Sequence, residues 1–162
     1  MREPLSSETL AKTCKEYFSF VWLLYYEMQM PMLLGFKKVF GDLESFHVNG
    51  ICIINQALHS KKNDNSEMSK EFYLEKYFFA DKKDDVGVNA MSISDITGIP
   101  RATVIRKLNK LLKEKFLKVD NKKHYSSSGH HAQKLLDVQK VTLDNLSKFA
   151  SSVYNLCLMK ND

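Results

Sequence analysis

The chain has 162 residues, of which 44% are hydrophobic and 27% charged, a composition that suits one soluble domain or one compact two-part unit. Only 6 glycines and 3 prolines argue against a loop-rich or mainly β protein. The net charge of +5 favours anionic partners, and three distant cysteines without a CxxC pair favour reduced thiols in a cytoplasm over a disulfide scaffold or a zinc site.

The sequence of the N-terminal part predicts several helices. Residues 6–8 (Ser-Ser-Glu) offer an N-cap and an acidic first turn for a helix that runs to about Met30, and Pro31 should bend or end that helix. A second helical stretch is expected over residues 32–40. Gly41-Asp42 is then a stop-and-restart signal, after which apolar residues again recur at helical spacing.

The apolar run 17–34 raises the question of a membrane span. A span requires about 20 apolar residues with few charges, whereas this run contains Glu27, Gln29 and Pro31. We therefore predict a buried core or dimer-interface helix and no membrane partner. Its aromatic residues either pack in such an interface or line a pocket for a small-molecule effector, and the sequence leaves an effector undecided.

The middle of the chain predicts a polar loop over residues 59–70 and a short aromatic segment over residues 71–80, which fits a helix or a strand equally well. A second turn follows. We divide the chain into an N-terminal helical region that supports or dimerises, a central functional region and a C-terminal helix, with bounds of 1–87, 88–128 and 129–162.

The central region begins with a helix, a glycine turn and a second helix. Asn89 can cap a helix over residues 90–97, and Gly98 suits the left-handed position that ends it. Pro100 suits the first position of the next helix, which should cover about residues 100–115. This order is the pattern of a helix-turn-helix.

The second helix has two distinct faces at 100° per residue. The predicted apolar face consists of Val104, Ile105, Leu108, Leu111 and Leu112. The opposite face carries short and basic side chains, namely Ala102, Thr103, Arg106, Lys110 and Lys113, with Lys107 and Asn109 at its flanks. A helix that reads the major groove of DNA needs such a layout.

A hairpin should follow this helix. Residues 116–120 and 124–128 predict two short strands, and the basic link between them would form a wing at residues 120–124. From Ile99 to Lys123 there are nine Lys and Arg against two acidic residues, so this stretch carries +7 and the remainder of the chain −2. The positive charge is thus concentrated where a phosphate-facing surface is expected.

The central region resembles the winged helix-turn-helix of bacterial transcriptional regulators, above all the MarR-like group. The similarity is carried by "GIPRATVIRKLNKL", specifically by Gly98, Arg101, Thr103, Val104 and Arg106. It departs at Thr97, where an apolar residue is common, and in the long insertion 59–87. The resemblance implies a mainly α fold with a winged helix-turn-helix and a small β-hairpin, flanked by helices that form a homodimer.

The sequence therefore predicts a cytoplasmic regulator that binds double-stranded DNA. Thr103, Arg106 and Lys110 are expected to face base edges. Contacts to phosphates are expected from Arg101, Lys107, Lys113, Lys122 and Lys123, with Gly98 and Pro100 as structural turn residues. Two alternatives remain, a winged helix that binds a protein and an architectural protein that binds DNA without sequence preference.

The C-terminal helix carries an apolar series that consists of Leu136, Leu143, Leu146, Phe149 and Val153. It either packs on its own domain or forms a dimer, and we predict dimerisation. His130-His131 do not share a helix face and lack a third ligand, so no metal and no cofactor is expected. The chain contains none of the common catalytic motifs, which argues against an enzyme.

Overall fold

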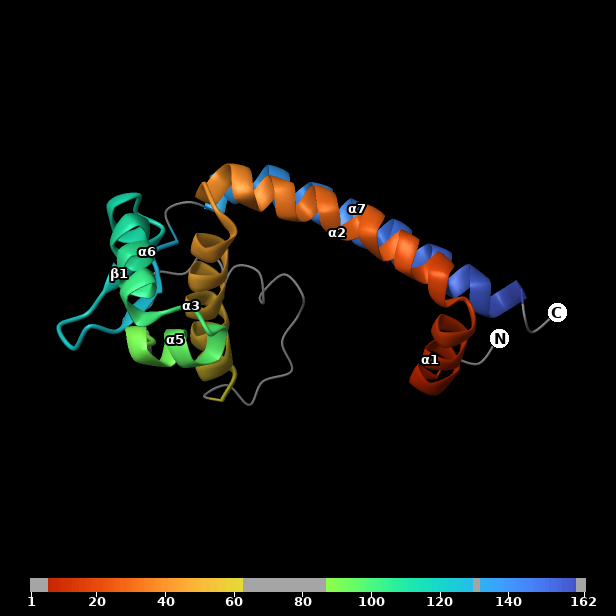
Figure 1. Cartoon of the computed structure of the whole chain (residues 1–162), viewed down its shortest axis with the longest axis horizontal. Coiled ribbons are helices and arrows are strands. Elements are labelled where there is room, and N and C mark those ends of the chain that lie inside the picture. The colour runs from red at the N-terminus through yellow and green to blue at the C-terminus, as the bar shows by residue number, and fades with distance from the viewer. Residues whose placement is uncertain (1–5, 63–86, 130–131, 160–162) are drawn as a thin grey trace. The chain divides into compact units, whose positions relative to one another are not determined.

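The computed structural model describes residues 6–62, 87–129 and 132–159, which are mainly helical with one small two-stranded sheet (Figure 1). The chain forms two compact units, a terminal unit of residues 1–35 with 136–162 and a central unit of residues 36–135. Among the described residues, no helix has the length and apolar character needed to cross a membrane. The elements are α1 (Ser7–Glu16), α2 (Phe18–Phe40), α3 (Leu43–Lys62), α5 (Ala90–Thr97), α6 (Arg101–Lys113), β1 (Leu117–Val119), β2 (Tyr125–Ser127) and α7 (Ala132–Met159).

The first two helices differ from the prediction of one helix that ends near Pro31. The side chain of Ser6 caps α1, as predicted, and accepts the N–H of Thr9 at 3.1 Å. The helix breaks at Tyr17 without any helix-breaking residue there. By contrast, α2 continues through Pro31 to Phe40. Pro31 lies on an exposed side of α2, where solvent can hydrogen-bond the Glu27 carbonyl that loses its N–H partner.

Within the terminal unit, α2 and α7 approach each other closely. A Cβ atom at Gly35 would lie 2.9 Å from Cγ1 of Val138, so a larger residue at position 35 would push the helices apart. The predicted dimerisation series on α7 is divided. Val153 is 7% exposed and is buried within the chain, so its assignment to a dimer contact is wrong. Leu136 and Phe149 are half-buried, and Leu143 and Leu146 are exposed.

The central unit has one hydrophobic core. It is built from Phe40 of α2, Val48 and Cys52 of α3, Val88 and Ile93, Val104, Leu108 and Leu111 of α6, and Phe116 and Leu117 at the start of the hairpin. Because α3 contributes to this core, the predicted boundary between residues 87 and 88 does not coincide with the boundary of the unit. The structure thus joins α3 to the region that carries α6.

The turn between α5 and α6 agrees with the sequence prediction. The Asn89 side chain accepts the N–H groups of Met91 and Ser92, and Gly98 ends α5 with a φ of 69°. Pro100 occupies the N-cap of α6 and not the predicted first helical position, so α6 begins one residue later, at Arg101. Thr97 stands where an apolar residue is common, and its hydroxyl group stabilises the end of α5 by donating to the Ile93 carbonyl at 2.7 Å.

Replacing Gly98 with alanine should destabilise the chain, because a Cβ atom is strained at this positive φ although the space around it is open. We expect a loss of about 1 kcal/mol in the free energy of unfolding. A matched control is Gly50→Ala inside α3, where a Cβ atom also meets nothing. This substitution should raise the free energy of unfolding by roughly 0.5–1 kcal/mol. Urea titrations followed by circular dichroism measure both, and equal signs would contradict the prediction.

The predicted hairpin is confirmed. Strands β1 and β2 pair antiparallel, with Leu117 opposite Ser127 and Val119 opposite Tyr125. Val88 extends the sheet because its N–H and carbonyl both bond to Tyr125, at 3.0 and 2.9 Å. On the same edge of β2 as Val88, the side-chain oxygen of Gln56 in α3 accepts the N–H of Ser127 at 3.2 Å. The hairpin is therefore held to the helices that surround α6.

Candidate nucleic-acid interface

Helix α6 has a buried side and a solvent side. Its buried side consists of Val104, Lys107, Leu108 and Leu111. The exposed residues define what we call the outer α6 face, namely Arg101, Ala102, Ile105, Arg106, Asn109 and Lys113. This face contains two arginines, one lysine, one amide and two apolar side chains, and so offers both hydrogen-bond donors and methyl contacts.

The outer α6 face corrects two sequence assignments. Ile105 was expected in the apolar face, yet it is 38% exposed. Asn109 was expected at a flank, yet it is exposed midway between Ile105 and Lys113 around the helix. Both differences follow from the direction of the core, which lies opposite Ala102 and Arg106. The buried side is centred on Leu111 and not on Leu112.

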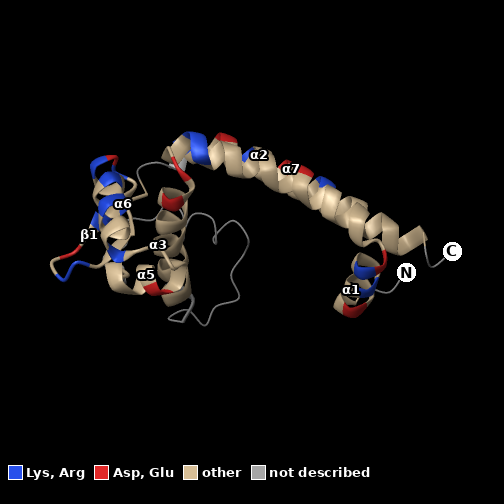
Figure 2. Ribbon diagram, viewed as in Figure 1, with Lys and Arg blue, Asp and Glu red and all other residues tan. Residues whose placement is uncertain are grey.

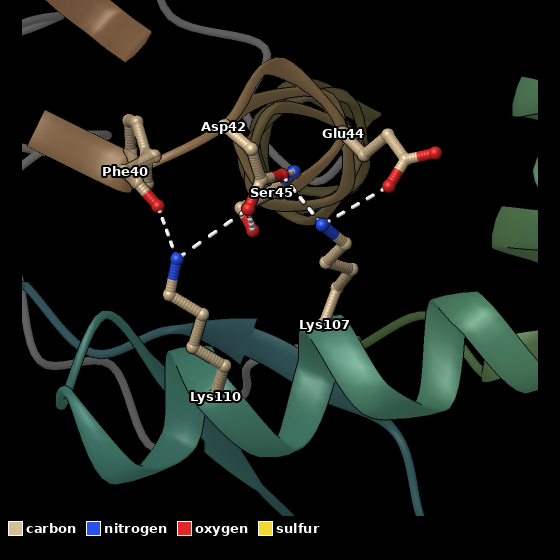
Figure 3. A network of polar contacts seen from close by, with 6 residues as sticks. All are labelled: Phe40, Asp42, Glu44, Ser45, Lys107 and Lys110. Carbon is tan, nitrogen blue, oxygen red and sulfur yellow. Dashed lines mark hydrogen bonds and ion pairs between the residues drawn. The ribbon is translucent and has the colours of Figure 1, made fainter. Parts of the chain in front are cut away.

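Two lysines predicted to contact DNA are bound inside the chain instead. Lys107 is 7% exposed, and its Nζ lies 2.8 Å from Oδ1 of Asp42 and 3.0 Å from Oε2 of Glu44. Lys110 donates to the Phe40 carbonyl and lies 3.5 Å from Oδ2 of Asp42. Figure 3 shows both side chains pointing from α6 to the turn between α2 and α3. The burial of Lys107 contradicts its assignment to phosphates. Lys110 is half-buried and held at the same turn, so it is not presented on the exposed side of α6.

Asp42 is the centre of this network. Its carboxylate also accepts the backbone N–H of Ser45 at 2.7 Å and the Ser45 hydroxyl at 3.0 Å, which caps α3. Burial alone would raise the pKa of Asp42. The hydrogen bonds from Lys107 and Ser45 and the charge of Lys107 outweigh it and hold the pKa well below the ordinary 3.8.

The same contacts act on Lys107 in the opposite direction. Burial alone would lower its pKa, but the hydrogen bonds and charges of Asp42 and Glu44 outweigh burial and raise the pKa above 10.5. Lys107 therefore stays charged at neutral pH. In this position it fixes α6 to the turn that joins α2 and α3, and it leaves the outer α6 face unobstructed.

The tip of the hairpin presents two more lysines. The Asp120 carboxylate accepts the N–H groups of Lys122 and His124, each at 2.8 Å. These two backbone N–H groups, His124 foremost, lower the pKa of Asp120. Lys123 adopts a positive φ of 60° in the tip. The chain thus turns sharply, and the side chains of Lys122 and Lys123 are exposed.

A cleft of about 840 Å³ separates the outer α6 face from the hairpin. Its walls include Arg101, Ile105 and Asn109 from α6 and Asn121, Lys122 and Lys123 from the hairpin. Figure 2 shows blue Lys and Arg positions on the ribbon of α6 and of the hairpin beside it. The cleft therefore has basic groups on both walls, an arrangement that can hold an extended polyanion.

The predicted site residues are thus brought together in part. Arg101, Lys122 and Lys123 line the same cleft, Arg106 and Lys113 are exposed elsewhere on α6, and Thr103 is half-buried. Asn109 and Ile105 are the residues that the sequence prediction missed. Comparisons of the chain with protein-family profiles, with curated proteins and with solved structures gave no significant match. The resemblance to MarR-like regulators stays a prediction.

Proposed function

We propose that the protein is a transcriptional regulator that binds double-stranded DNA in a sequence-specific manner through a winged helix-turn-helix. The observation that carries this proposal is the outer α6 face beside a basic hairpin, with both packed on one hydrophobic core. An α-helix fits the major groove of B-DNA, which is about 12 Å wide. The hairpin then lies beside the groove, where its tip can reach the phosphate backbone.

The base contacts are assigned from the middle of the outer α6 face. Arg106 has the geometry to bind O6 and N7 of guanine, and Asn109 is suited to N6 and N7 of adenine. Ala102 and Ile105 can pack against thymine methyl groups. Thr103 keeps its predicted contact with base edges, from a half-buried position at the edge of this surface. The resulting assignment replaces Lys110 by Asn109, because Lys110 is engaged with the turn before α3.

Contacts to phosphates are assigned to the basic residues around this centre. Arg101 begins α6, Lys113 ends it, and Lys122 and Lys123 occupy the hairpin tip. Lys107 is omitted because its ammonium group binds Asp42 and Glu44. Such contacts provide affinity that depends on salt and not on sequence.

Selection of bound duplexes from a random DNA pool, followed by anisotropy titrations on the enriched sequence, tests the proposal. We expect a consensus with affinity at least about 1,000-fold above that for unrelated duplex at the same salt. Enriched pools without a consensus would indicate an architectural binder. The absence of salt-sensitive duplex binding would contradict the proposal.

Replacing Lys122 with alanine should weaken binding to all duplexes by the same factor. One phosphate contact is lost, so the slope of log affinity against log salt should fall by about one. Lys148→Ala on an exposed side of α7 is the matched control and should leave the slope unchanged. A change that depends on sequence would place Lys122 against bases and not phosphates.

A protein-binding winged helix is the second candidate, and one observation favours it. Met91, Ile105 and Val119 line the cleft and are 38–51% exposed. Apolar side chains of this kind are typical of protein interfaces. The basic residues on both walls favour DNA over this candidate. A stable protein complex blocked by Ile105→Asp, without duplex binding at low salt, would reverse this preference.

We also propose that the protein acts as a homodimer. Dimers of helix-turn-helix proteins place two recognition helices about one DNA turn apart and read palindromic sites. The selected consensus should then be an inverted repeat. A single unrepeated half-site would contradict a dimer on DNA.

A further inference from the structure

Helix α2 is apolar around its whole circumference. Between Phe18 and Phe36 its sequence contains one charged residue, Glu27. An amphipathic surface helix has one apolar stripe, whereas a helix that is apolar all round is normally buried on all sides. In the terminal unit, α2 contacts α7 along the side that includes Gly35. Its remaining circumference needs another explanation.

The remaining circumference carries large exposed side chains. Seven residues of α2 are between 43% and 61% exposed, namely Phe18, Phe20, Trp22, Leu23, Tyr26, Met30 and Leu34. We call them the outer α2 face. At 100° per residue they spread over roughly 200° of the helix. Trp22 stacks on Tyr26 with ring centroids 5.5 Å apart, so part of this face is already an ordered aromatic surface.

The area of the outer α2 face suits a protein dimer. A large side chain that is about half exposed presents roughly 100 Å², so seven present roughly 700 Å². The largest apolar patch on a typical monomer is about 300–600 Å². A standard stable interface buries about 800 Å² on each partner. The outer α2 face therefore exceeds what a monomer usually exposes and approaches what one side of a dimer buries.

The composition of this face favours protein over lipid. Helices that lie on membranes carry Lys and Arg beside their apolar face, whereas the charge within this stretch is the single acidic Glu27. Aromatic residues and Met, which dominate the outer α2 face, are enriched in protein interfaces. In a two-fold dimer the same patch covers itself on both subunits, so one pairing buries both copies of this face.

We infer that the outer α2 face is the surface through which two copies of this chain pair, with α2 of one copy against α2 of the other. This inference rests on the homodimer proposed above and specifies its interface. It moves the main contact from the leucine series of α7 to α2. Leu143 and Leu146 of α7 are then outside the main contact.

Sedimentation velocity on the full chain at micromolar concentration tests the inference. We expect a mass of twice 18.7 kDa for the wild type. Met30→Glu places a carboxylate in both halves of the interface and should raise the dimer dissociation constant at least about 100-fold. Because Met30 is exposed in the single chain, its replacement should leave the helical circular dichroism unchanged. Leu143→Glu, at a residue that is equally apolar and exposed, is the matched control and should remain dimeric.

A second measurement does not depend on a folded monomer. Tyr26→benzoylphenylalanine should give a photo-crosslinked dimer, and Leu143→benzoylphenylalanine should give none. The reverse result in either experiment would overturn the α2 interface and leave the homodimer intact. A monomeric wild-type chain would overturn both the α2 interface and the homodimer. The same holds if that monomer co-sediments with anionic lipid vesicles. A dimer without salt-sensitive duplex binding would overturn the DNA proposal alone.

Discussion

Replacing Asp42 with alanine is expected to lower the free energy of unfolding by about 2–4 kcal/mol. The carboxylate caps α3 at Ser45 and binds the ammonium group of Lys107. Without it, α3 loses its cap and Lys107 is left buried beside the half-exposed Glu44. Denaturant titrations of the full chain at a fixed protein concentration measure this loss.

The matched variant Lys107→Met should cost much less, about 1 kcal/mol. Methionine retains the packing of the lysine stem, and the carboxylates that remain are exposed enough to be solvated. In the Asp42→Ala/Lys107→Met double variant, part of the Asp42→Ala loss should be recovered because no buried charge remains. Equal costs for the two single variants would show that Lys107 is not the buried partner that matters.

The difference between wild type and Asp42→Ala should also depend on pH in a defined direction. The folded state holds the pKa of Asp42 well below 3.8, so its charge stabilises the fold fully above about pH 5. As the pH falls below the unfolded value, the unfolded chain takes up a proton first and this contribution is lost progressively. The two chains should therefore converge in stability on acidification. A constant difference from pH 7 to pH 2 would contradict the ionic role of Asp42.

Arg106→Ala is expected to weaken binding to the selected DNA site by about 1–3 kcal/mol, or roughly 5–150-fold. Arg106 is exposed on the outer α6 face, one turn after Ala102 and beside Asn109. The guanidinium group is assigned to guanine, so the preference at one base-pair position should disappear together with the affinity. Anisotropy titrations against the site and its single-base variants measure both effects.

Two further variants separate recognition from charge. Arg106→Lys preserves the charge but loses the paired donors, so specificity should fall while binding to unrelated duplex is maintained. Lys113→Ala removes a positive charge from the same face and should weaken all sequences alike. If Arg106→Ala behaves as Lys113→Ala does, Arg106 contacts phosphates and the base assignment is wrong.

The local signals around α5 and α6 are sufficient to predict the two helices and the turn between them. Asn89 and Gly98 determine the two ends of α5 through contacts within a few residues, so the sequence shows them directly. The β1 and β2 pairing is equally local, because residues 120–124 close it. The rotation of α6 depends on what packs behind it. Ile105 and Leu111 have the same apolar character, and tertiary contacts alone decide which of them is buried.

The placement of Lys107 and Lys110 away from the outer α6 face has a long-range cause. Their partners are Asp42 and the Phe40 carbonyl, about seventy residues earlier, and helical periodicity contains no information on that distance. A lysine is by default assigned to solvent. The buried side of α3 was hidden for the same reason, because it combines Val48 and Cys52 with the polar Ser45, Asn49 and Gln56. A pattern of apolar residues does not reveal such a face.

The separation of tasks along α6 has a practical consequence for retargeting the protein. Within its 13 residues, the side chains that hold the helix in place and those on the outer α6 face do not coincide. Ala102, Arg106 and Asn109 can therefore be randomised together while Lys107, Leu108 and Leu111 keep the helix docked. The outer α6 face can thus be varied without changing the contacts that hold α6 in place. A library at these three positions should yield folded proteins with altered DNA-sequence preference. In all of them Asp42 and Glu44 would still bind Lys107 and hold α6 in place.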